Sequence, residues 1–152
     1  MALNLTQEEA DELLQLLKQC VKETINLPKA GSRQDYEAIA KNNKSERFVI
    51  SVNRVNKRAK KVTFNARYKK GDVVLMRLDI APTSTHVNPP ELGGSKICSS
   101  HLHLYREGFD AKYAEPFDVD DTNICKAFEE FLIKFNVLKT PSIVEQLSLE
   151  GE

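Results

Sequence analysis

The feature that most constrains the fold is a change in hydrophobic period, from three or four residues to two, near Arg47. Between residues 47 and 80 apolar and polar side chains alternate. Lys70-Gly71-Asp72 separates two such runs as a turn, with glycine supplying the positive φ. Links this short leave no room for a crossover helix, so consecutive strands must run antiparallel. The pattern therefore predicts a meander, joined by a further strand at residues 101–105.

Apolar residues at helical spacing flank the alternating region. A capping box at Thr6 and Glu9 begins a helix that we expect over residues 6–26. A second helix is expected over residues 122–137, with its phenylalanines in the core. A short helix is also expected from Ser32 onward. Helices are therefore expected both before and after the strands in the sequence.

These elements predict a single domain over residues 1–152, because the length suits one core. The expected fold class is α+β, an antiparallel sheet of about four to five strands within residues 46–117 with helices packed on one face. The other face would be wet. No apolar run reaches the roughly 18 residues of a membrane helix. An export signal and a disulfide framework are also lacking, so a cytoplasmic protein with no membrane partner is expected.

Charge is distributed unevenly along the chain. The net charge is zero, but residues 1–43, 44–77 and 78–152 carry −2, +9 and −7. A central block this basic favours a polyanionic partner, although lysines also protect sheet edges from aggregation. The side chains expected to bind nucleic acid from the wet face are Lys61, Arg67, Lys69 and Arg77.

All three histidines, His86, His101 and His103, fall within 18 residues. Residues two apart in a strand share a face, so His101, His103 and Tyr105 should point one way. The intervening leucines would face the helices. The imidazoles would then lie on the basic face, beside a Pro- and Gly-rich loop that carries His86.

Three interpretations of this cluster stay open. In the first, His101 and His103 are an acid–base pair that cleaves RNA without metal or other cofactor. His86 and Tyr105 support the pair, and arginines neutralise the phosphate. In the second, the three imidazoles bind a metal such as zinc. Glu107 adds to a likeness to the first metal motif of cupins, but no histidine follows His103 as it would in a cupin. In the third, the histidines are structural, or their face docks an acidic protein.

The segment His86-Val87-Asn88-Pro89, followed by His101-Leu102-His103-Leu104-Tyr105-Arg106-Glu107-Gly108, resembles a family of uncharacterised bacterial and phage proteins. That resemblance implies no established activity. Asp79-Ile80-Ala81-Pro82, leading to the histidines, is similar in layout to small RNase toxins of toxin–antitoxin pairs. The leading hypothesis is an RNA-directed protein of a mobile element, with an endoribonuclease activity of toxin type. An inhibitor that binds a host defence protein is the alternative, and the sequence allows a homodimer.

Overall fold

A computed structural model describes residues 4–54, 61–80, 85–120, 122–138 and 141–145. Thirteen helices and strands make up most of this part of the chain. In chain order they are α1 (Gln7–Gln15), β1 (Lys18–Cys20), β2 (Thr24–Leu27), β3 (Arg33–Ala40), β4 (Asn43–Asn53), β5 (Val62–Tyr68), β6 (Val73–Ile80), β7 (His86–Val87), β8 (Lys96–Ile97), β9 (His101–Arg106), β10 (Asp110–Pro116), α2 (Ile124–Lys134) and β11 (Ser142–Glu145).

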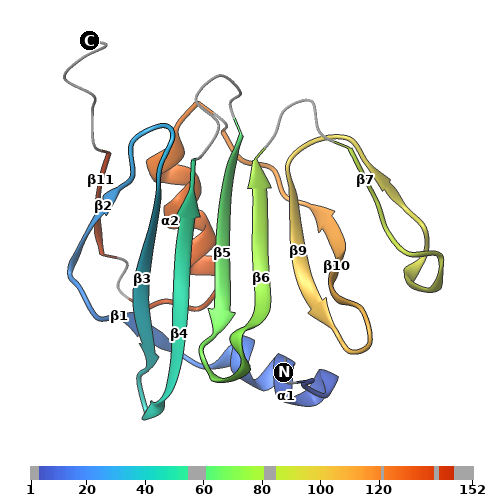
Figure 1. The fold of residues 1–152 in the computed structure, drawn as a ribbon, viewed down its shortest axis with the longest axis horizontal. Helices are drawn as coiled ribbons and strands as arrows, with labels where there is room; N and C mark the ends of the chain where they lie inside the picture. Colours follow the sequence, from blue (N-terminus) through green and yellow to red (C-terminus); the bar gives the residue numbers. More distant parts are fainter. Residues whose placement is uncertain (1–3, 55–60, 81–84, 121, 139–140, 146–152) are drawn as a thin grey trace.

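The main sheet has seven strands in the order β1-β3-β4-β5-β6-β9-β10, and every neighbouring pair is antiparallel (Figure 1). Strands account for 48% of the structure and helices for 20%. The expected α+β class with four to five strands is therefore wrong, and the protein is mostly β. The predicted meander is present: β5 and β6 are joined by a turn in which Gly71 has a φ of 75°.

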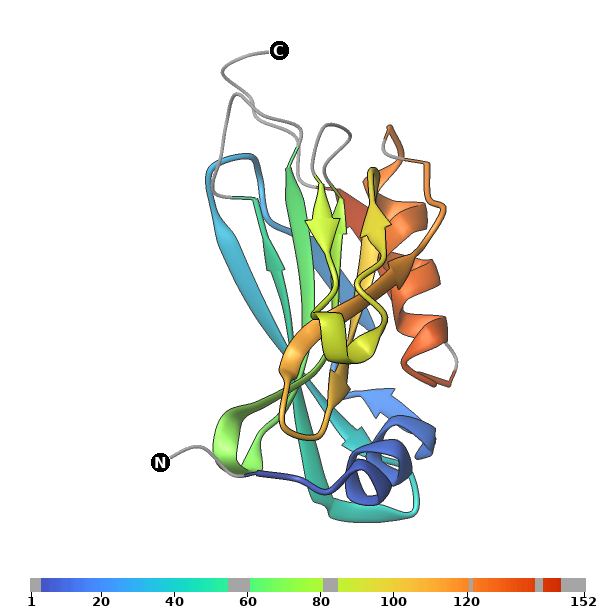
Figure 2. The ribbon, with the colours of Figure 1, turned by 90° about the vertical axis from the view of Figure 1, so that its right-hand side faces the viewer.

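The two helices cover different parts of the sheet (Figure 2). α2 lies along one face, where Phe128 packs against Phe64 of β5 with ring centroids 4.9 Å apart. α1 lies across one end of the strands and buries Ala10 and Leu13. The phenylalanines of the last helix are fully buried, as the sequence predicts. This side of the sheet holds the hydrophobic core.

The expected helix over residues 6–26 is wrong beyond Gln15. Its capping box is present, but Leu16 has extended dihedral angles (φ −56°, ψ 137°) and the chain continues as β1 and β2. Leu17 and Val21, which the helical stripe would bury, are 43% and 56% exposed. Pairing with β3 fixes β1 as a strand, so tertiary contacts override the local helical spacing.

Lys18 is the first residue of β1 and follows α1 closely in the chain. Its side chain is fully buried, and its Nζ donates to the carbonyl oxygens of Leu14, Leu16 and Phe135 at 2.9–3.0 Å. Burial lowers the pKa of this ammonium group to about 7, whereas its carbonyl partners favour the charged form. Since Leu14 belongs to α1 and Phe135 caps α2, one side chain satisfies carbonyl groups at the ends of both helices.

The short helix expected from Ser32 is strand β3 instead. Ala38 and Ala40 are buried, and the intervening positions are more exposed, which is a strand period rather than a helical one. Glu37 forms ion pairs with Arg47 and, at 3.3 Å, with Lys69 on the open face. These cross-strand contacts stabilise residues whose helical propensity would favour a helix.

The C-terminal helix is confirmed with shorter bounds, Ile124–Lys134 in place of 122–137. Asn123 is its N-cap, because the Asn123 side chain accepts from the Lys126 backbone amide at 3.1 Å. The strands of the main sheet lie between Lys18 and Pro116, so this sheet begins well before the expected start at residue 46. Among the described residues, neither helix has the length and apolar character needed to cross a bilayer.

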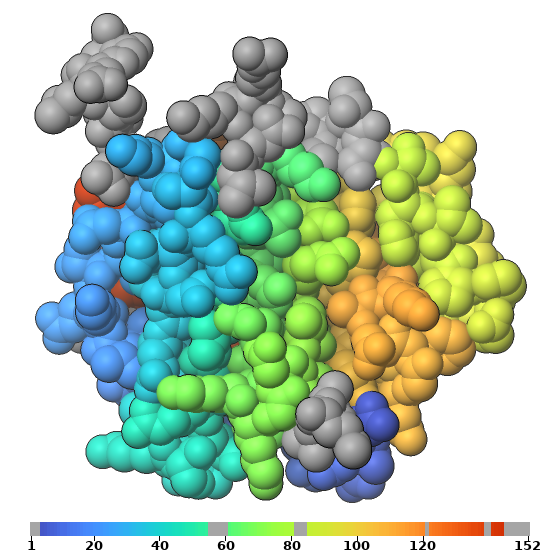
Figure 3. Space-filling model, viewed as in Figure 1, coloured from blue at the N-terminus to red at the C-terminus, as the bar shows by residue number. Residues whose placement is uncertain are grey.

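The sheet face away from α2 is largely open (Figure 3). Its side chains alternate with the core residues of the central strands. A ribbon formed by β7 and β8 lies at the β10 end of the sheet (Figures 1 and 2). We call the sheet face opposite α2 the outer face.

Candidate functional site

Strand pairing brings two polar residues of β6 against the two histidines of β9. The register places Arg77 opposite His103 and Asp79 opposite His101. Leu102, between the histidines, is fully buried in the core on the helix side. The histidines therefore lie on the outer face beside an arginine.

The two β9 imidazoles are nevertheless buried, each with 3% of its surface exposed. The sequence predicted rings in open water, and this part of the prediction is wrong. The His86 ring packs on both of them, with centroids 5.3 Å from His101 and 4.8 Å from His103. The rings of His101 and His103 are 4.9 Å apart. The three side chains thus form one cluster, which we call the histidine cluster.

One nitrogen of each β9 imidazole is fixed by a backbone carbonyl. His101 Nδ1 lies 2.9 Å from Ser99 O, and His103 Nδ1 lies 2.7 Å from Ala111 O. A carbonyl can only accept, so both Nδ1 atoms donate to it. Nε2 of each ring then has the lone pair when the ring is neutral, and a proton that faces Asp79 when the ring is charged. Burial is the main cause that lowers the pKa of His101, which favours its neutral form.

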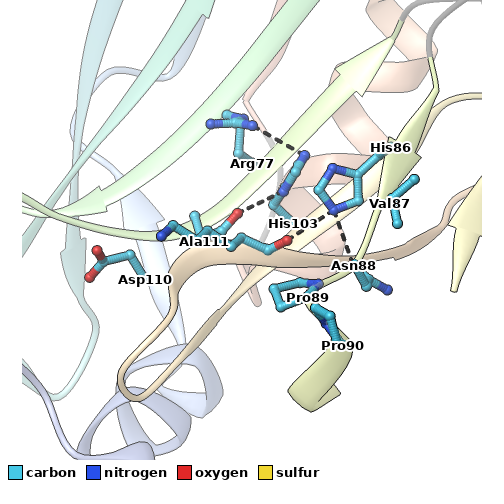
Figure 4. A pocket seen from close by; sticks show the side chains of 10 residues that line it. Arg77, His86, Val87, Asn88, Pro89, Pro90, His103, Asp110 and Ala111 are labelled. Carbon is cyan, nitrogen blue, oxygen red and sulfur yellow. Dashed lines mark hydrogen bonds between the residues drawn. The ribbon is translucent and has the colours of Figure 1, made fainter. Parts of the chain in front are cut away.

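His86 is held in the opposite tautomer. Its Nε2 lies 2.9 Å from Lys112 O and 3.0 Å from Asn88 Oδ1, both acceptors, so the lone pair is on Nδ1 (Figure 4). Asn88 in turn accepts from Ala114 N and donates to Ala114 O, each at 2.8 Å. These side-chain bonds dock the loop that carries His86 onto β10.

Asp79 completes the cluster from β6. Its Oδ2 lies 3.5 Å from His101 Nε2 and 3.3 Å from His103 Nε2. Arg77 contacts the same carboxylate, with Nε 3.1 Å from Oδ1. Burial opposes ionisation, but the contacts with His103 and Arg77 outweigh it and lower the pKa of Asp79 to about 2. The cluster therefore contains one firmly ionised carboxylate.

A pocket of about 640 Å³ opens beside the cluster (Figure 4). Arg77, His86 and His103 line one part of it, and the β9–β10 turn region lines another through Asp110 and Lys112. The Arg77 guanidinium lies 3.1 Å from His103 Nε2. An anionic group in the pocket could therefore reach a guanidinium and two imidazoles.

The other residues expected in the site lie apart from it. Tyr105 is buried, and its hydroxyl donates to Leu5 O at 2.7 Å and accepts from Leu5 N at 3.1 Å. Arg67 pairs with Asp72 at 3.0 Å, and Lys69 pairs with Glu37.

Lys61 is exposed just before β5. Of the four expected nucleic-acid contacts, Arg77 is the one that lies against the histidines. Sequence reasoning missed Asp79 and Asn88 as members of the site. The outward position of Asp79 on its strand and the His-Asn-Pro motif were the available signals.

The three rings have separations expected around a metal ion. With a metal–nitrogen distance of about 2.1 Å, ring centroids of cis ligands lie about 4.5–5.3 Å apart and the ligand atoms about 3.0–3.4 Å apart. The observed centroid separations are 4.8, 4.9 and 5.3 Å. Ligand nitrogens of the three histidines lie within 4.8 Å of one another, so the widest pair would have to close by up to about 1.4 Å.

Comparisons with known proteins give a family but no activity. No curated protein and no solved structure gives a significant match to the chain. The model of a family of unknown function (DUF6978) matches residues 5–137. This match agrees with the expectation of an uncharacterised family, and it covers every residue of the histidine cluster. The chain belongs to this family of unknown function, DUF6978.

Proposed function

We propose that the protein binds a first-row transition metal ion through His86, His101, His103 and Asp79. The observation that carries the proposal is the orientation of the rings. Each has one ring nitrogen bonded to a backbone carbonyl, so the other nitrogen is the one that an ion would bind. One nitrogen of each histidine lies within 4.8 Å of those of the other two. Metal-ligating histidines in proteins are fixed in this way, since the second-shell bond selects the tautomer and the ring orientation.

The carboxylate fits the same role. Asp79 Oδ2 lies 3.5 Å from His101 Nε2 and 3.3 Å from His103 Nε2. Neighbouring ligand atoms of one such ion are about 3.0–3.4 Å apart, so these distances are close to the expected ones. Imidazole nitrogens and one carboxylate suit zinc, iron or manganese better than calcium or magnesium. Arg77 now donates to the lone pair of His103, so its guanidinium must swing away when an ion binds.

With a water as a fifth ligand beside the four protein ligands, such a centre would supply the chemistry for hydrolysis of an anionic ester in the adjoining pocket. A metal-held water has a lowered pKa and is a nucleophile at neutral pH. Arg77, at the edge of the pocket, supplies the positive charge that an anionic substrate requires.

Metal titration tests this proposal. We expect one Zn²⁺ per chain in isothermal titration of chelator-treated protein. His101→Gln or His103→Gln should lower the affinity at least 100-fold. Tyr105→Phe is the matched control, because it changes a buried β9 side chain outside the cluster. Wild-type protein that takes up no zinc at millimolar concentration, or histidine variants that bind as tightly as the control, would refute the metal site.

A second candidate is metal-independent RNA cleavage of toxin type, with His101 and His103 as the acid–base pair. The contact between Arg77 and His103 Nε2, at 3.1 Å on the pocket wall, favours it because a phosphate could bridge the two groups. This candidate predicts cleavage of total RNA that persists in excess EDTA and is lost in both histidine variants. Cleavage that requires added metal would leave only the first proposal.

A further inference from the structure

Arg77 is the cation that contacts the ligand atoms of the proposed metal centre (Figure 4). Its Nη2 lies 3.1 Å from His103 Nε2 and 3.3 Å from Asp79 Oδ2, and its Nε lies 3.1 Å from Asp79 Oδ1. The nitrogen and the oxygen that Nη2 contacts are themselves 3.3 Å apart. One guanidinium therefore contacts two of the four proposed ligand atoms.

A metal ion bound to the same two atoms would lie close to this guanidinium. Combining the three distances, an ion about 2.1 Å from both His103 Nε2 and Asp79 Oδ2 is at most about 4 Å from Arg77 Nη2. Two positive charges this close repel each other in a partly buried site. His103 Nε2 also has a single lone pair, which cannot point at the ion and at the guanidinium together. Metal binding thus releases Arg77 from His103.

The released guanidinium has the pocket beside it. Arg77 lines the pocket and 34% of its side chain is exposed, so the guanidinium can turn toward the pocket while the β6 backbone stays in place. His86 and His103 line the same pocket, so the proposed ion would also lie at its wall. An oxyanion in the pocket could then bind the ion through one oxygen and the guanidinium through another. Such an anion would offset the repulsion between the two cations.

We propose that Arg77 couples the metal site to an anion site, so that a metal ion and a phosphate-like oxyanion each raise the affinity for the other. This inference rests on the proposed metal centre and names the regulation of that site. Without an anion, Arg77 competes with the ion for His103 and Asp79 and lowers the metal affinity. With an anion bound, the guanidinium contacts the anion and no longer opposes the ion. The coupling is reciprocal, since each ligand must change the affinity for the other by the same factor.

The other charged residues that line the pocket do not make these contacts. Lys112 contacts the histidine cluster through its backbone oxygen, which accepts from His86 Nε2 at 2.9 Å. Asp110 carries a negative charge, which repels an anion. Among the residues that the structure describes, Arg77 is thus the cation of the pocket lining whose side chain contacts ligand atoms of the centre. The coupling should therefore depend on Arg77 and not on the total charge of the pocket.

Isothermal titration of chelator-treated protein with Zn²⁺ tests the coupling, with millimolar dimethyl phosphate as the anion. Dimethyl phosphate should raise the zinc affinity of wild type about tenfold, whereas trimethyl phosphate, a neutral ester of similar shape, should change it less than about twofold. Without anion, Arg77→Gln should bind zinc about tenfold more tightly than wild type, because the competing contacts are lost. Dimethyl phosphate should then add less than about threefold. Lys112→Gln is the matched control, since it removes a positive charge from the same pocket and should behave as wild type.

The coupling and the metal centre fail separately. Zinc affinity that dimethyl and trimethyl phosphate change alike, or an Arg77→Gln variant that binds zinc more weakly than wild type, overturns the coupling. Either result leaves the metal centre intact, because zinc still binds. Protein that takes up no zinc, with or without dimethyl phosphate, overturns both. The comparison of the two phosphate esters uses wild type alone, so it decides the matter if Arg77→Gln proves unstable in thermal unfolding.

Discussion

The ionised carboxylate of Asp79 should make a measurable contribution to stability that disappears in acid. Folding lowers its pKa from 3.8 to about 2. A group whose pKa is depressed in the folded state stabilises that state at pH values above the unfolded pKa. The stabilisation is lost as the pH falls from about 4 to about 2. A difference of one pKa unit corresponds to about 1.36 kcal/mol, so the lowered pKa of Asp79 should add about 2.4 kcal/mol to the free energy of unfolding at pH 7.

The assay compares wild type with Asp79→Asn by urea unfolding of metal-free protein. We expect the free energy of unfolding of the variant to be about 2.4 kcal/mol lower at pH 7. Other carboxyl groups also titrate in acid, so the difference between the two proteins is the quantity to follow. It should shrink steadily below pH 4. A difference that is absent at pH 7, or equally large at pH 2.5, would refute the assigned role of the carboxylate.

Three further substitutions test packing, capping and loop docking. Phe128→Ala should lower the free energy of unfolding by about 3–5 kcal/mol, measured by urea unfolding, whereas Ile133→Ala, 57% exposed on the same helix, should change it by under about 0.5 kcal/mol. Lys18→Met should lower the free energy of unfolding by about 1–3 kcal/mol in the same assay, because it leaves three buried carbonyl groups unpaired. The control Lys22→Met, at an exposed position, should leave it almost unchanged. Asn88→Ala should weaken zinc binding about 10–100-fold in isothermal titration, because His86 loses its anchor; unchanged affinity would contradict that role.

The meander and the last helix follow from local pattern. The alternation over β5 and β6 fixes which side chains face the core, and Gly71 marks the turn between them. Phe128 and Phe131 repeat at helical spacing and are buried as expected. Period and turn chemistry act over a few residues, so sequence alone is sufficient there.

The N-terminal third could not be predicted in this way. Residues 18–27 continue an apolar spacing that suits a helix, yet β1 is held by pairing with β3, more than ten residues later. In β3 the spacing of Tyr36, Ile39 and Ala40 suits a helix, but pairing with β4 holds this segment as a strand. Partner strands supply the stabilisation in both cases, and a local pattern contains no information about partners.

The sequence predicts which face the site residues lie on, but it does not predict which of them are in contact. Strand periodicity places His101 and His103 on one face, and it also turns Arg77 and Asp79 outward. The pairing of β6 with β9, which brings the four side chains together, is a property of topology. Tyr105 was misassigned because periodicity gives a face and not a contact: its hydroxyl bonds to Leu5 at the N-terminal end of the chain.

The most direct test of the metal centre is a crystal structure of zinc-loaded protein with anomalous scattering recorded at the zinc edge. The proposed centre predicts one strong peak about 2.0–2.2 Å from His86 Nδ1, His101 Nε2, His103 Nε2 and Asp79 Oδ2, with the Arg77 guanidinium turned away from His103. A histidine cluster without an anomalous peak, with Arg77 still bonded to His103 Nε2, would contradict it.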